Sequence, residues 1–404
     1  MSIPASSSVD AEAVPEATGP RGRPGQARPF AGLIEPVLVE EPVDFTFDGS
    51  VARGHAAAAW VWFARDIAGS DIDFSRVEDG SLTAGDLEAV LPQLLAKAGD
   101  AVAQADRDDD ARRRLRVQLG GDDVFERLPT VLGALRNRAL LDKAQVFGRA
   151  INGLAEEAGL VAALQSMPKQ DKMAAAFLMH AAMGQIANPT RLASAVLKIS
   201  GSAAEAAVTR AGFAPVIDAM LAHAQNQLHL LQPSGPFADI DLVCRALERF
   251  HRLARAITSH VELERSGRWG MILGRLTRRV SERMEPRLRN ILPDLNGAMR
   301  RGREGSDRLD PDQLLAALNG MYLLATLRDC KDSLALNAIF EQTWLQSGQA
   351  LEMHLNRGLD LLRANPADVI VAKRLDVGIK MAEVRFNPEY AETLRRARAA
   401  AMKR

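Results

Sequence analysis

The fold class is decided by residues 268–301, which read RWGMILGRLTRRVSERMEPRLRNILPDLNGAMRR. Apolar residues recur in this stretch three or four positions apart, at Trp269, Ile272, Leu276, Val280 and Met284. This spacing gathers them on one face of an α-helix, because a helix makes one turn every 3.6 residues. Arginines occupy the flanks and the far side, so the stretch is predicted to form a basic amphipathic helix.

The same helical spacing continues on both sides, from Val51 to the C-terminus. Helix starts are marked by Thr83 with Asp86 and by Asp310 followed by Pro311, two capping patterns. We therefore predict an all-α fold, either a large multi-helix bundle or an irregular solenoid of helical hairpins. The expected helices span 51–68, 83–104, 123–157, 168–187, 190–211, 213–231, 237–265, 268–301, 310–328, 332–363, 366–383 and 387–402. We expect a break within 123–157 and a break at Gly201 within 190–211.

Residues 1–50 have a different character. Seven prolines interrupt them, and each proline lacks a backbone N–H and has a fixed φ angle. We predict a disordered arm at 1–50, with an extended acidic and apolar segment at 35–48 where apolar residues alternate. A breaker cluster at 232–236, reading QPSGP, then predicts two helical subdomains, 51–232 and 237–404.

Composition limits the class of protein. The 404 residues include 51 Lys plus Arg and 51 Asp plus Glu, so a zero net charge gives no global attraction to nucleic acid or membranes. Cys244 and Cys330 lie far apart, and no secretory or transmembrane segment is visible, which predicts a cytoplasmic protein without a cofactor. Nine lysines against 42 arginines indicate a GC-rich bacterial genome.

One segment departs from this balance. Residues 245–308 contain 16 arginines and eight acidic residues, a local charge of +8. A basic amphipathic helix can bind a partner groove, an anionic lipid surface or a phosphate backbone, although it can also be a core helix with a solvated outer face. The candidate partner or anion-binding surface consists of Trp269, Arg275, Arg278, Arg279, Arg283 and Arg287.

The acidic segment at 35–48 is the predicted complement of these arginines. Its charged and aromatic residues are Glu40, Glu41, Asp44, Phe45 and Phe47. We predict that it docks against the helices between Arg245 and Arg301, in the same chain or in a neighbouring protomer, and masks them from other anions. Exposed ion pairs contribute only about 0.2 to 1 kcal/mol each, so the docking is expected to be weak and switchable.

Candidate chemistry is sparse. Glu248 and His251 form an ExxH step, but the further carboxylates of a di-iron site are missing, so no metal is expected. Nucleotide-binding and hydrolase motifs are also missing. The favoured function is a non-enzymatic scaffold or adaptor that binds another protein or itself as a homo-oligomer. The alternatives are a nucleic-acid or anionic-lipid binder using residues 245–308, and an enzyme with an inter-helix pocket built on His180, His223 or His251.

Overall fold

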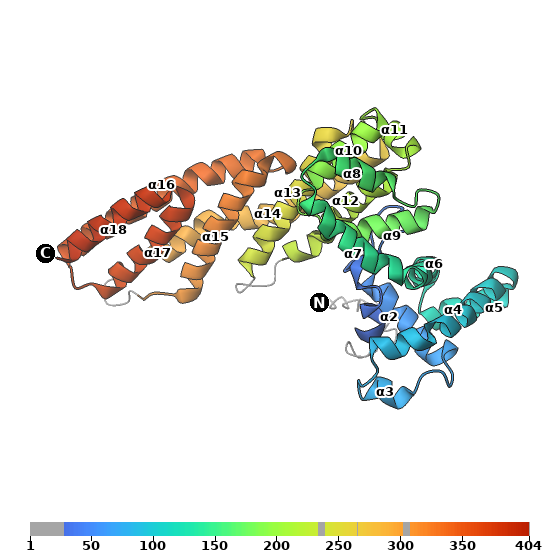
Figure 1. Cartoon of the computed structure of the whole chain (residues 1–404). Helices are drawn as coiled ribbons and strands as arrows, with labels where there is room; N and C mark the ends of the chain where they lie inside the picture. Colours follow the sequence, from blue (N-terminus) through green and yellow to red (C-terminus); the bar gives the residue numbers. More distant parts are fainter. Residues whose placement is uncertain (1–27, 233–238, 265, 302–307, 404) are drawn as a thin grey trace, which may run out of the picture. The chain divides into compact units, whose positions relative to one another are not determined.

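The computed structural model describes residues 28–232, 239–264, 266–301 and 308–403 (Figure 1). Eighteen α-helices and two two-residue strands account for almost all regular structure in these ranges, which confirms the all-α prediction. None of the helices in these ranges is long and apolar enough to cross a membrane.

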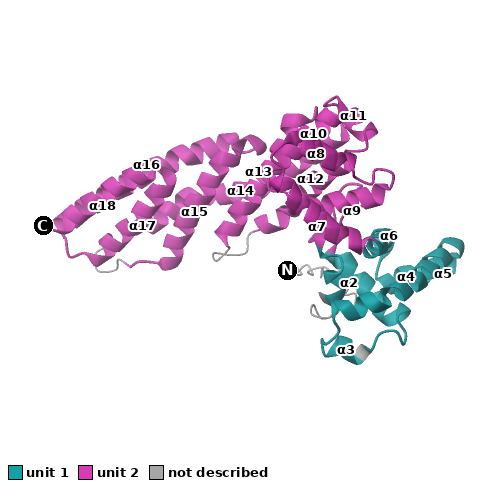
Figure 2. Ribbon diagram, viewed as in Figure 1, with its two compact units in different colours: residues 1–35, 53–136 teal, residues 36–52, 137–404 magenta. Residues whose placement is uncertain are grey.

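The chain divides into two compact units (Figure 2). Unit 1 takes the described residues up to Glu35 together with Arg53–Arg136. Phe30 organises part of its core, with its ring 5.4 Å from that of Trp60 and 5.6 Å from that of Phe63. Its elements are α1 (Arg28–Gly32), α2 (Arg53–Trp62), the π-helical η2 (Phe63–Ile67), α3 (Phe74–Glu78), α4 (Ala84–Arg107), α5 (Asp109–Leu119) and α6 (Asp122–Arg136).

Unit 2 takes Pro36–Ala52 and the chain from Asn137 onward. The 3-10 turn η1 (Glu35–Val37) leads into it from unit 1. Its other elements are β1 (Leu38–Val39), β2 (Val51–Ala52), α7 (Arg138–Gly153), α8 (Glu157–Gln165), α9 (Lys172–Met183), α10 (Pro189–Ser200), α11 (Glu205–Arg210), α12 (Ala214–Asn226), η3 (Leu228–Leu231), α13 (Ile240–His260), α14 (Arg268–Met299), α15 (Pro311–Cys330), η4 (Lys331–Ser333), α16 (Asn337–Ala364), α17 (Val369–Arg385) and α18 (Pro388–Met402).

Helices α13 to α18 follow a stacking rule. From α14 onward each helix contacts the next one along the chain, and the pairs α13–α15, α14–α16, α15–α17 and α16–α18 are also in contact. Contacts between neighbours and next neighbours are typical of stacked helical hairpins, in which each hairpin buries its apolar face on the one before. This arrangement brings the C-terminal end of α14 beside α16 and α17 (Figure 1).

Local sequence explains where the helices begin and end. Thr83 and Asp86 form a complete capping box at the start of α4, and Asp310 accepts hydrogen bonds from the first turn of α15. Gly201 ends α10 with a φ of +68°, a left-handed conformation that glycine adopts without a Cβ clash. The break expected within 123–157 lies at Asn137, between α6 and α7.

The predicted disordered arm requires a correction. Residues 1–27 lie outside the described part of the chain, but residues 28–50 have defined structure. Phe30, Ile34 and Val37 are almost completely buried, and the 35–48 segment includes the short strand β1. These residues are ordered because their apolar side chains complete the two cores, which offsets the entropy lost by a proline-rich chain.

The predicted subdomain boundary at 232–237 falls at residues 233–238, which lie outside the described residues. The compact units divide at Arg136 and Asn137 instead. Helices on the two sides of the breaker cluster, α12 and α13, pack against each other and contribute to one apolar core. A cluster of turn-forming residues therefore connects two helices of unit 2.

Candidate functional site

Residues 36–52, here called the strap, form an extended crossing on the surface of unit 2. Its ends pair as parallel strands, with Leu38 opposite Val51 and Val39 opposite Ala52. Val39, Val43 and Phe47 are buried, and Val43 and Phe47 belong to the unit 2 core. The strap passes close to α9 at Gly49, where a Cβ atom would lie 2.5 Å from the carbonyl oxygen of Ala176. Only glycine fits there without a displacement of the backbone.

Two side chains of α12 hold the strap by hydrogen bonds to its backbone. Gln225, whose side chain is buried, accepts from the backbone N–H of Asp44 at 3.2 Å and donates to the carbonyl of Pro42 at 2.9 Å. Asn226 accepts from the N–H of Glu40 at 3.1 Å. These bonds fix the strap's path independently of its charges.

The arginines of α14 meet the acidic residues of the strap. Arg279 Nη1 lies 3.0 Å from Asp44 Oδ2, and Arg279 Nη2 lies 3.6 Å from Glu41. Arg275 donates to the backbone carbonyl of Asp44 at 3.2 Å, and Arg268 donates to that of Thr46 at 2.7 Å. The structure thus brings the predicted acidic segment and the predicted arginine surface together. Whether this contact masks the arginines from other anions stays a prediction.

The other residues of the predicted surface have different environments. Arg283 donates to the carbonyl of Leu228, and Arg287 donates to that of Gln232, so both stabilise the turn after α12. Arg278 is exposed. Trp269 is fully buried and donates its indole N–H to Asp218 at 2.8 Å, so its side chain is part of the core. Burial raises the pKa of Asp218, and hydrogen bonds from Arg268 and Trp269 oppose that shift.

We expect buried contacts to hold the strap more strongly than its ion pairs. Gln225→Ala leaves a strap N–H and a strap carbonyl without partners and should lower the free energy of unfolding by about 2 kcal/mol. Arg279→Ala removes only partly exposed ion pairs and should lower it by less than about 1 kcal/mol. Urea denaturation of the two variants measures the difference, and a larger loss for Arg279→Ala would contradict this assignment.

Two of the three candidate catalytic histidines meet inside unit 2. The rings of His180 on α9 and His223 on α12 lie 4.3 Å apart, and His223 Nε2 donates to the backbone carbonyl of His180 at 2.9 Å. Burial lowers the pKa of His223 to about 4 and that of His180 well below its usual value. Phe47 of the strap covers His180 at a ring distance of 5.8 Å. The ring of His180 is therefore enclosed, that of His223 is partly buried beside it, and burial disfavours a proton on either.

The third histidine lies elsewhere. His251 Nδ1 lies 2.9 Å from the hydroxyl of Ser333, and burial lowers the pKa of its imidazole. Among the described residues, no group of three or more His, Cys, Asp or Glu side chains is arranged to hold a metal ion. The ExxH step of Glu248 and His251 thus has no set of further ligands around it in the described part of the chain.

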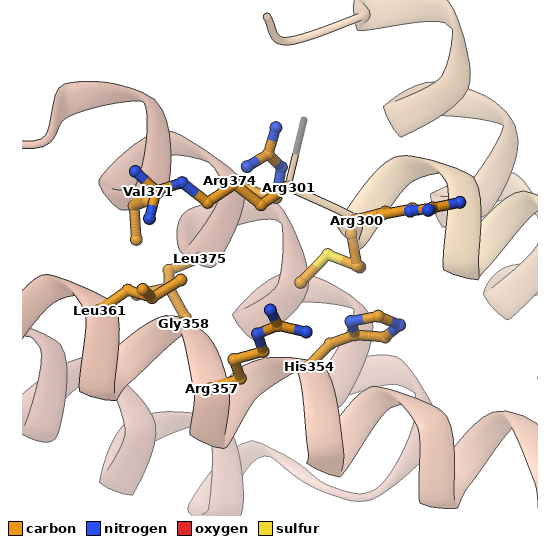
Figure 3. Close-up of a pocket in the computed structure, with 10 residues that line it drawn as sticks. Arg300, Arg301, His354, Arg357, Gly358, Leu361, Val371, Arg374 and Leu375 are labelled. Atoms are coloured by element: carbon orange, nitrogen blue, oxygen red, sulfur yellow. The ribbon is translucent and has the colours of Figure 1, made fainter. Parts of the chain in front are cut away.

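A pocket of about 270 Å³ opens where α14 ends beside α16 and α17 (Figure 3). Its cationic lining combines Arg300 and Arg301 after α14 with Arg357 of α16 and Arg374 of α17. Figure 3 shows Arg301 and Arg374 on one side, Arg357 and His354 on the other, and Arg300 extending away from them. Its apolar lining is formed by Met299, Leu361, Val371 and Leu375.

The described side chains that line this pocket are basic or uncharged. None of the ten described residues that line it is acidic. Asp368 lies 3.8 Å from Arg301, but it also accepts the N–H groups of Ile370 and Val371 as the N-cap of α17. His354 Nε2 donates to Asn296, and burial together with Arg357 lowers the pKa of its imidazole. The described lining of the pocket is therefore basic with an apolar part, and Arg301 and Arg374 also make contacts within the protein.

Sequence reasoning selected Arg300 and Arg301 only as members of the basic 245–308 segment, and it missed Arg357 and Arg374. These two arginines join the pocket because α14, α16 and α17 stack, and the sequence does not show that stacking. Comparison of the chain with protein-family models, with curated proteins and with solved structures found no match.

Proposed function

We propose that the protein is a non-enzymatic helical scaffold or adaptor that recognises an anionic group in the arginine pocket formed by Arg300, Arg301, Arg357 and Arg374. The observation that carries this proposal is that four arginines from three helical elements line one cavity, with Arg301, Arg357 and Arg374 grouped around it and Arg300 at its edge. Arginine is suited to such a site because its planar fork of N–H donors matches the oxygens of phosphate and carboxylate groups.

Electrostatics supports an anionic ligand. Like charges held close together repel each other, and an anion placed between them relieves that repulsion. Arg374 is almost completely buried, so its charge is weakly screened by solvent. A charge-assisted hydrogen bond to a buried guanidinium is about twice as strong as a neutral one.

The shape of the site favours a compact group over an extended polyanion. A nucleic acid or a membrane needs a row of exposed cations along a ridge or plane. The middle of α14 offered such a row in sequence, but Arg275 and Arg279 contact the strap, and Arg283 and Arg287 contact the chain after α12. The pocket is concave and enclosed by three elements, which suits a single anionic group.

Other features support the proposals that the protein is a scaffold and that it is cytoplasmic. The enzyme alternative required two histidines and a carboxylate in one open pocket, but His180 is buried beneath Phe47 and His223 is partly buried beside it. Cys244 and Cys330 are free thiols, which suits a reducing bacterial cytoplasm. Stacked hairpins such as α13–α18 give extended surfaces on which a second protein can bind.

Titration with inorganic phosphate tests the anion site. We expect phosphate to bind with a dissociation constant of about 1 mM or lower, and Arg357→Ala to weaken binding about tenfold because one charge-assisted contact is lost. The matched control is Arg363→Ala, which removes an exposed arginine of the same helix that does not line the pocket. Isothermal titration calorimetry measures both variants. The proposal fails if phosphate does not bind, or if both variants lose affinity equally.

A further inference from the structure

The arginine pocket has two chemically different walls. Met299, Leu361, Val371 and Leu375 supply the apolar lining, and Arg301, Arg357 and Arg374 supply the cationic lining from two sides. The apolar residues come from the same three elements as the arginines, so the helix stacking that gathers the charges also builds the apolar surface. A ligand that fills this pocket must satisfy both walls.

We propose that the ligand is a small organic phosphate, whose phosphate group contacts the arginines and whose apolar body packs against Leu361, Val371 and Leu375. This inference rests on the proposed function, and it specifies the ligand class of the same site.

The arrangement of the cations favours phosphate over carboxylate. Arg301, Arg357 and Arg374 belong to different elements and approach the pocket from two sides (Figure 3). A carboxylate offers two oxygens in one plane, which one guanidinium fork can saturate. A phosphate monoester offers three acceptor oxygens in a tetrahedral arrangement and a charge of about −1.5 to −2, so it can accept from forks that approach in different directions.

The volume and the apolar wall favour an organic ester over the inorganic ion. The pocket's 270 Å³ exceeds the volume of the five heavy atoms of phosphate, because one water takes a share of about 30 Å³ in the liquid. Phosphate alone would leave the apolar wall in contact with water. An apolar body that displaces this water gains affinity in proportion to the apolar area that it covers.

The size of the pocket also limits the ligand. It is at the lower end of the range for small-molecule sites, which is about 300 to 1,000 Å³. Gly358 lines the pocket where α16 meets α17, and a Cβ at that position would lie 2.7 Å from Leu375 Cδ2, so the two helices are in close contact there. A body of one small ring or a short chain fits such a space.

The test compares three probes on the full-length protein by calorimetry: phenyl phosphate, inorganic phosphate and benzyl alcohol. We expect phenyl phosphate to bind at least roughly tenfold more tightly than inorganic phosphate, because its ring covers the apolar wall. Benzyl alcohol, which lacks the anionic group, should bind more weakly than either anion. This comparison needs no variant, so it does not depend on how a substitution affects folding.

Two variants test which side chains contribute to the binding affinity, and a third is their control. Leu361→Asn keeps a side chain of similar size but removes its apolar character, and it should bring the affinity for phenyl phosphate down toward that for inorganic phosphate. Arg357→Ala should weaken binding of both anions about tenfold, while Arg363→Ala should leave both unchanged. Leu361 is partly exposed, which limits the effect of its replacement on the core.

The outcomes separate this inference from the proposed function. Equal affinities for phenyl phosphate and inorganic phosphate would overturn the organic-ester inference and leave anion recognition intact. If the Leu361→Asn variant still binds phenyl phosphate as much more tightly than inorganic phosphate as the unchanged protein does, the placement of the ligand's apolar body against Leu361 is wrong. If neither anion binds, or if benzyl alcohol binds as tightly as phenyl phosphate, anion recognition itself is wrong.

Discussion

Replacing Phe47 by alanine is expected to lower the free energy of unfolding by about 3 to 5 kcal/mol, the usual loss for a large aromatic side chain deleted from a core. Phe47 is 4 % exposed and lies between Phe45 of the strap and His180 of α9. The cavity left by its ring would be enclosed by Gly49 and the backbone of α9, which are already in close contact and can relax little.

Urea denaturation followed by circular dichroism measures this loss. Phe45→Ala is the matched control, because Phe45 is an aromatic of the same strap that is only partly buried, and we expect a loss of about 1 kcal/mol for it. A loss below about 1 kcal/mol for Phe47→Ala would show that the strap is a weakly attached segment, as the sequence predicts.

The position of Phe47 bears on the masking hypothesis. Its alternation with Val43 and Phe45 predicted an extended segment, and the charges of Glu41 and Asp44 predicted its destination on α14. The sequence could not show that Phe47 would enter the core, because that depends on α9 and α12, more than a hundred residues away. A variant without residues 1–50 would lose both this aromatic contact and the acidic side chains. Its comparison with the full-length protein therefore does not measure the electrostatic contribution of the strap alone.

The helices were predictable because their signals are local. Capping at Thr83 and at Asp310 and the left-handed glycine at 201 each act within one turn of the chain. The short helix α1 was missed because five residues are too few to show a helical period, although Phe30 and Ile34 stand four positions apart. The paired strands β1 and β2 were missed for the same reason, since each has two residues.

The candidate site was only partly predictable, because its residues meet through tertiary packing. Nothing in the local sequence of Arg357 and Arg374 distinguishes them from Arg363 and Arg385, the other arginines of α16 and α17. They join Arg300 and Arg301 because α16 and α17 stack on the end of α14. The same holds for His180 and His223, which are 43 positions apart and meet only because α9 packs against α12.

The buried histidine pair predicts that the protein loses stability in mild acid. His180 and His223 face each other, with Phe47 of the strap over His180 and Arg249 of α13 near His223. Arg249 donates to the carbonyls of Met183 and Ile186 at the end of α9, so its cation is fixed there. A proton on either ring would add a cation near the fixed guanidinium of Arg249, which is unfavourable because His180 is buried and His223 is partly buried.

The sign of the effect follows from proton linkage. Burial lowers the pKa of His223 from 6.5 to about 4, so between these values the unfolded chain binds a proton that the folded chain does not. Stability is complete above about pH 6.5 and falls as the pH decreases toward 4, by about 3 kcal/mol for His223, to which His180 adds in the same direction. Urea denaturation at a series of pH values measures this slope.

His223→Gln provides the decisive comparison. The glutamine amide keeps a donor for the carbonyl of His180 but does not titrate. Between pH 6.5 and 4.5, the free energy of unfolding of the variant should therefore depend less steeply on pH, by about the contribution of one proton. His260→Gln is the control, since it replaces a partly buried histidine on α13 and leaves the His180 and His223 pair in place, so the steep region should remain. An unchanged slope in His223→Gln would mean that the acid sensitivity arises elsewhere, and that the enclosed pair accepts its proton without disturbing the packing of α9, α12 and the strap.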